Sequence, residues 1–152
     1  MGPDPAFNTT KSFVDSYELF RIGSVFMGRL SKPTDAELAI LRVLWERGPS
    51  TVRQVHEALA GRETGYTTTL KLMQIMADKG LVKRNEAART HVYSAIAGEA
   101  QTQHQLLRDL ADRAFGGSAA ALVLRALSAE DTSESELREI RKLIDDYREK
   151  RS

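Results

Sequence analysis

The sequence predicts a mainly α-helical protein that carries one small β-hairpin. Two observations support this fold class. Apolar residues recur at helical spacing through most of the chain from residue 34 onward. Between residues 81 and 96 the spacing changes to that of strands on either side of a short polar tip. With 152 residues and 41% hydrophobic content, the chain can form one domain or two small ones.

A first helix is expected to begin at Thr34, because a hydroxyl residue followed three positions later by Glu37 is the pattern of a capping box. Gly48-Pro49 ends this helix. Its apolar side consists of Leu38, Leu41, Leu44 and Trp45. Ser50 is expected to cap a short second helix that Gly61 closes. The apolar side of that helix consists of Val52, Val55, Leu59 and Ala60.

A third helix is expected to open near Tyr66-Thr67 and to end at Lys79-Gly80, a basic last turn followed by a glycine. The opening is unusual, since three consecutive threonines are poor helix formers. Thr69 continues the apolar side with Met73 and Met76, whereas Thr67 and Thr68 do not. Two of the three threonines therefore need a reason other than packing.

A hairpin is expected next, with strands at 81–84 and 91–96 joined by the turn "NEAART". Three short helices followed by a hairpin are the order of a winged helix-turn-helix, in which the third helix enters the DNA major groove and the hairpin lies along the backbone. This order explains the threonines, because a short hydroxyl side chain lets a helix approach base edges closely. The candidate DNA-binding residues are Thr51, Arg53, Tyr66, Thr67, Thr68, Lys71, Arg89 and His91. Each of them could also be an ordinary solvated side chain.

Helices return after Gly98. One apolar stripe, which Gly116-Gly117 ends, consists of Leu106, Leu107, Leu110, Ala114 and Phe115. The run 119–127 is almost entirely apolar, and Ser133 with Glu136 forms a second capping box before the last helix. One chain cannot bury these apolar faces, so a helical dimerisation domain is expected at 98–150, after a winged-helix domain at 30–97. The candidate dimerisation residues are Leu122, Leu124, Leu127, Leu137, Ile140, Leu143, Ile144 and Tyr147.

The stretches "LSKPTDAELAILRVLWERGPSTVRQVHEAL", "YTTTLKLMQIMADKGLVKR" and "RTHVYSA" resemble the penicillinase-repressor family, over roughly 30–150. The resemblance implies a homodimeric transcriptional repressor that binds an inverted-repeat operator and dimerises through its C-terminal helices. It also implies release through the C-terminal domain, where a sensor-protease system cleaves an Asn-Phe bond in the penicillinase branch. Here "VLRAL" places Arg125-Ala126 at that position as the candidate cleavage site.

Charge and composition limit the other function classes. Residues 31–96 hold ten Lys/Arg against seven Asp/Glu, whereas residues 97–152 hold nine against eleven, so the basic half coincides with the expected DNA-binding domain. The chain has no cysteine, which excludes thiolate metal sites and fits a reducing cytoplasm. No apolar run approaches the roughly 20 residues of a membrane span. Neither a cofactor nor membrane association is therefore expected.

No catalytic pattern is found, so an enzyme is not expected. The three histidines are scattered, and His56-Glu57 is not followed by a second histidine at zinc-ligand spacing. The remaining alternative is a winged helix that contacts another protein rather than DNA. Residues 1–29 are expected to be a leader that is either foreign to the natural chain or flexible, with Met27 as a plausible natural start; a short native helix is the alternative.

Overall fold

A computed structural model describes residues 31–59, 64–129 and 132–152. The leader therefore lies outside the described residues, as do Ala60 and Gly61 at the end of the second helix. The helices are α2 (Asp35–Arg47), α3 (Val52–Ala58), α4 (Tyr66–Asp78), α5 (Glu99–Ala114), α6 (Ala119–Ala129) and α7 (Glu134–Arg151). The strands are β1 (Ser50–Thr51), β2 (Val82–Asn85) and β3 (Val92–Ala95). The expected fold class, mainly helical with a small hairpin, is confirmed.

The chain divides into two compact units, one through Leu106 and one from Leu107 to the end. The division falls inside α5. The first unit holds the three short helices and the sheet. The second holds the end of α5 with α6 and α7. In the described part of either unit, no helix is long and apolar enough to cross a membrane.

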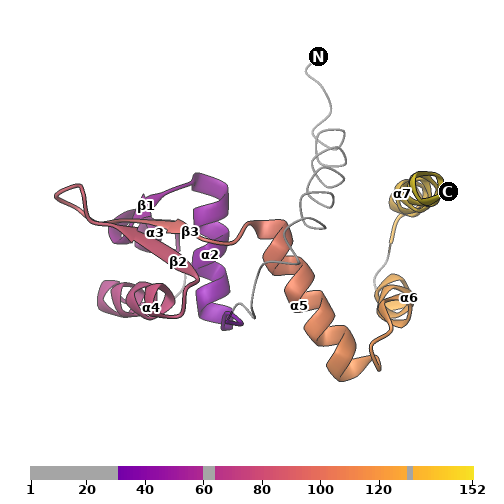
Figure 1. Ribbon diagram of the computed structural model, residues 1–152, viewed down its shortest axis with the longest axis horizontal. Coiled ribbons are helices and arrows are strands. Elements are labelled where there is room, and N and C mark those ends of the chain that lie inside the picture. The colour runs from indigo at the N-terminus through magenta and orange to yellow at the C-terminus, as the bar shows by residue number, and fades with distance from the viewer. Residues whose placement is uncertain (1–30, 60–63, 130–131) are drawn as a thin grey trace, which may run out of the picture. The chain divides into compact units, whose positions relative to one another are not determined.

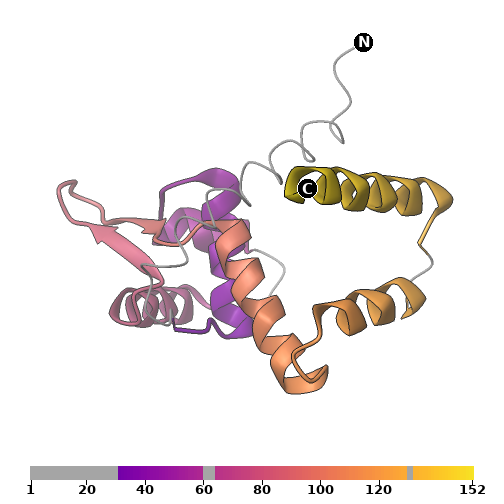
Figure 2. The ribbon, with the colours of Figure 1, turned by 45° about the vertical axis from the view of Figure 1, so that its right-hand side comes forward.

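The three strands form one antiparallel sheet in the order β1-β3-β2. β2 and β3 make the expected hairpin, whose tip projects beyond the helices of this unit (Figures 1 and 2). β1 was not expected, and it changes the start of α3. Ser50 pairs with Tyr93 in the sheet and donates its hydroxyl to the carbonyl of Gly48, so Ser50 is not the cap. Thr51 caps α3 instead, in a capping box with Gln54.

The capping signals at the other helix ends are confirmed. Thr34 and Glu37 form the capping box of α2, and Ser133 and Glu136 form that of α7. α4 ends in a Schellman motif: the N–H of Gly80 donates to Ala77 at 3.2 Å, and the N–H of Leu81 donates to Met76 at 2.9 Å. Gly80 has a φ of 78°, a conformation that side chains with a Cβ rarely adopt.

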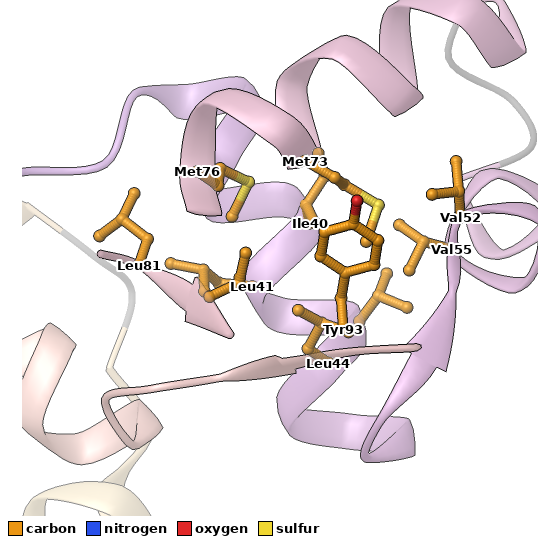
Figure 3. Packing of buried hydrophobic residues seen from close by; sticks show 11 residues of the cluster. Ile40, Leu41, Leu44, Val52, Val55, Met73, Met76, Leu81 and Tyr93 are labelled. Carbon is orange, nitrogen blue, oxygen red and sulfur yellow. The ribbon is translucent and has the colours of Figure 1, made fainter. Parts of the chain in front are cut away.

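The core of the first unit lies between the three helices and the sheet (Figure 3). Tyr93 of β3 stands in the middle of it and is almost fully buried. Met73 and Met76 of α4 are fully buried, as their spacing predicts. Trp45 packs against this cluster, and its indole Nε1 donates to the carbonyl of Ala97 at 3.0 Å, which ties α2 to the segment after β3.

An ion pair fixes the end of α4 to the start of α2. Lys79 Nζ lies 2.7 Å from Glu37 Oε2, and the backbone N–H of Thr34 donates to the same oxygen at 2.9 Å. Glu37 is buried. Burial alone would raise the pKa of its carboxyl, but the hydrogen bonds from Lys79 and Thr34 outweigh burial, and the pKa is lowered. The pair therefore stabilises the orientation of α4.

We expect Lys79→Met to destabilise the fold by about 1–3 kcal/mol at pH 7, because it leaves a buried carboxylate without its cation. A carboxyl whose pKa is lowered on folding stabilises the protein above its unfolded pKa, and this contribution is lost as the pH falls through the folded pKa. The destabilisation of Glu37→Gln relative to wild type should therefore shrink below about pH 4. Urea unfolding of the three proteins at pH 7 and in the acid range measures both effects.

The matched control is Arg47→Met, which removes a cation from an exposed position on α2. It should change the free energy of unfolding by less than about 0.5 kcal/mol. A Lys79→Met protein as stable as wild type at pH 7 would contradict a stabilising role for the ion pair.

Candidate nucleic-acid interface

α4 presents one mostly polar side to the outside of the first unit. The exposed side consists of Thr67, Thr68, Lys71, Gln74, Ile75 and Asp78, which we call the reading face. Thr69 is fully buried instead, as expected from its place in the apolar pattern. The three threonines thus divide as the spacing predicts, two outward and one inward.

The start of α4 differs from the starts of α2 and α7. Its N-cap is Gly65, and no side chain among the residues that the structure describes caps it. The first turn carries no acidic residue, whereas α2 and α7 both begin with two carboxylates. The first N–H groups of a helix lack partners within the helix, and the helix dipole favours an anion there. This end of α4 therefore suits a phosphate.

A small cluster that the sequence pattern did not reveal holds α4 against α3. The rings of His56 and Tyr66 meet edge to face, with centroids 5.8 Å apart. His56 Nδ1 lies 3.3 Å from the hydroxyl of Thr69, which donates to the carbonyl of Gly65 at 3.4 Å. Because the Thr69 hydroxyl donates to Gly65, it accepts from His56 Nδ1–H. Tyr66 is a candidate DNA-binding residue. Its side chain is 45% exposed, and the contact with His56 fixes the orientation of its ring.

Two further candidates lie at the start of α3. Arg53 is exposed, so its guanidinium can reach a ligand. Thr51 is half-buried, and its hydroxyl accepts the N–H of Gln54 at 3.2 Å in the capping box. The hydroxyl of Thr51 is therefore already engaged in capping, and Arg53 is the stronger candidate of the two.

The hairpin carries the last two candidates. Arg89 lies in the tip and His91 directly before β3, and both are exposed. Arg84 behaves differently: it forms an ion pair with Glu86, and its hydrogen bond to Tyr93 together with that carboxylate raises its pKa above the ordinary value. Arg84 is thus engaged within the hairpin, whereas Lys83, Arg89 and His91 are exposed basic or titratable side chains of the same hairpin.

Gln74 and Ile75 belong to the reading face but were not expected there. They follow Lys71 by three and four residues, so the helical period could have identified them. An exposed amide suits the paired donor and acceptor of adenine. Within the described ranges no group of three metal-ligating side chains is found. The exposed threonines, lysine and amide of the reading face are suited to recognising the surface of a ligand.

Several known proteins are similar to this chain. The model of the penicillinase repressor family matches residues 33–146. The transcriptional regulator BlaI of Mycobacterium tuberculosis is 40% identical over 101 residues, which cover 64% of this chain and 73% of that protein. The penicillinase repressor of Bacillus licheniformis is 21% identical over 126 residues, which cover 82% of this chain and 98% of that one. A solved structure of the DNA-binding domain of the repressor BlaI matches 49% of this chain and 93% of that one, with a TM-score of 0.43 and 21% identity.

Proposed function

The chain belongs to the penicillinase repressor family of DNA-binding transcriptional repressors, and from this premise we propose that it binds an inverted-repeat operator as a homodimer. The observation that carries the proposal is the reading face, on which two outward threonines near the start of α4 are followed by a lysine one turn later. α4 enters the major groove, and the hairpin residues Arg89 and His91 contact the backbone beside it. The protein is not an enzyme, uses no cofactor and acts in the cytoplasm.

The second unit supports the homodimer. Within α7 no residue is buried, although Ile144 and Tyr147 are large and apolar or aromatic. On α6, Leu124 is 69% exposed. Large apolar side chains left exposed along two successive helices favour an interface, and closed two-fold dimers are the commonest assembly. A second copy of the chain covers these faces and places two copies of α4 on two half-sites. The winged-helix domain at 30–97 and the dimerisation domain at 98–150 are the corresponding proposed domains.

Release acts through the dimerisation domain. Arg125 and Ala126 stand at the position that corresponds to the family's cleavage site, and both are exposed on α6 in the single chain. In the proposed dimer, the second copy would cover the apolar face of α6 beside them. A sensor or protease that opens or cuts this region separates α7 from the DNA-binding domain. The two half-site contacts then become independent, and operator affinity falls.

We expect Thr68→Ala to weaken specific binding by about 1–3 kcal/mol, because a side chain that contacts a base edge contributes this much to discrimination. Lys71→Ala should lower affinity for all sequences and reduce the slope of log affinity against log salt by about one. Fluorescence anisotropy with a duplex selected from random sequences measures both. Thr68→Val and Thr68→Ser then separate the hydroxyl from the methyl group.

Arg42→Ala is the matched control for Lys71→Ala, since Arg42 is an exposed cation on α2 and does not belong to the reading face. Its salt slope should equal that of wild type. If Thr68→Ala and Lys71→Ala both bound the selected duplex like wild type, α4 would not be the recognition helix.

A further inference from the structure

Ile75 is an apolar side chain on a face that is otherwise polar. In the described part of the first unit, the large apolar or aromatic residues with substantial exposure are Tyr66, Ile75 and Ile96, at 45%, 38% and 47%. The ring of Tyr66 packs against His56. Leu72 and Ala77, neighbours of Ile75, are partly buried and pack against the core cluster, whereas Ile75 itself is exposed. Its side chain therefore remains available to a ligand.

Ile75 shares one row of α4 with two proposed DNA contacts. Thr68, Lys71 and Ile75 follow one another at spacings of three and four residues, which places their side chains along one side of a helix. Seven residues of α-helix span roughly 10 Å. That distance is about the rise of three base pairs at about 3.4 Å each. A helix that brings Thr68 to one base edge therefore brings Ile75 to another base pair.

The chemistry of the groove restricts what Ile75 can meet. In the major groove guanine, cytosine and adenine present hydrogen-bond donors and acceptors, and thymine adds an apolar 5-methyl group. An isoleucine placed against a donor or acceptor would remove it from water without replacing its hydrogen bond, which is costly. Against a methyl group, the same side chain buries apolar surface on both sides.

We propose that Ile75 is a specificity-determining residue that contacts the 5-methyl group of a thymine in each half-site. This inference rests on the proposed function, in which α4 lies in the major groove. Ile75 then discriminates between sequences through one apolar contact, while Lys71 beside it contributes attraction to phosphate that is independent of sequence.

The test removes the methyl group from the DNA and the side chain from the protein. Duplexes that the full-length chain selects from random sequences are resynthesised with each thymine replaced in turn by deoxyuridine, which lacks only the 5-methyl group. Affinity is measured by fluorescence anisotropy at one fixed salt concentration for wild type, Ile75→Ala and Ile96→Ala. At one thymine, loss of the methyl group should weaken wild-type binding about fourfold, the contribution of one buried methyl or methylene group.

Ile75→Ala should bind that thymine and deoxyuridine equally well and keep the wild-type response at every other thymine. Ile96→Ala removes a somewhat more exposed isoleucine outside α4 and should keep the complete wild-type profile. Equal profiles for wild type and Ile75→Ala, or a wild-type profile that no methyl group affects, would overturn the inference and leave the proposed function intact. Failure of the full-length chain to select any sequence would overturn the proposed function, and the inference with it.

Discussion

Replacing Leu124 and Ile144 together with aspartate is expected to turn the protein into a monomer and to weaken operator binding on the order of 100-fold or more. The two side chains are 69% and 52% exposed in the single chain, so charges there should cost the fold of each protomer little. In the proposed dimer the same charges would be buried without partners, which is costly. Sedimentation equilibrium gives the oligomeric state, and anisotropy with the selected duplex gives the affinity.

Ser135→Asp is the matched control, because it adds a carboxylate to the exposed first turn of α7, where the helix dipole favours negative charge. This variant should remain dimeric and bind normally. An unchanged dimer for the Leu124→Asp, Ile144→Asp protein would show that α6 and α7 do not form the interface.

Truncation after Leu127 is expected to have a similarly large effect. It removes α7, whose apolar residues have no buried position in the single chain, and leaves the first unit complete. The product should be a monomer that keeps the circular dichroism and cooperative unfolding of the winged helix. Its affinity for the complete operator should fall on the order of 100-fold, because the two half-site contacts are no longer linked.

A second truncation, after Arg148, separates loss of the interface from loss of the chain end. It retains Leu137, Ile140 and Tyr147 and should remain a dimer with normal affinity. A monomer ending at Leu127 that still held the operator as tightly as the full chain would contradict release through the dimerisation domain.

Local sequence signals predicted local structure well. The capping boxes at Thr34 and Ser133 depend on residues three positions apart, and both are present. Gly80 could be predicted to end α4 for the same reason, because this signal also depends on neighbouring residues. Ser50 was assigned wrongly because Ser50 and Thr51 are both suitable caps, and the choice depends on pairing with Tyr93 more than forty residues later. A two-residue strand carries too little pattern to be recognised before its partner is known.

The candidate interface divides in the same way. The outward direction of Thr67 and Thr68 follows from helical spacing alone. The contact of His56 with Tyr66 and Thr69 does not, because it depends on how two separate helices pack against each other. The pair of Lys79 with Glu37 joins residues 42 positions apart, and no pattern in the sequence connects them. Gln74 and Ile75 could have been predicted as DNA-binding candidates, because they lie one helical turn beyond Lys71 on the same side of the helix.

The central claim is that α4 reads a DNA sequence. Its most direct test is the affinity of the full-length chain for the selected duplex and for a scrambled duplex of the same length, each measured over a range of salt concentrations. We predict that affinity falls linearly with salt on a double-logarithmic plot for both duplexes, because phosphate contacts release counterions. The selected duplex should bind at least about 1,000-fold more tightly at physiological salt. Equal affinity for the two duplexes with little dependence on salt would contradict the claim and favour a winged helix that contacts another protein.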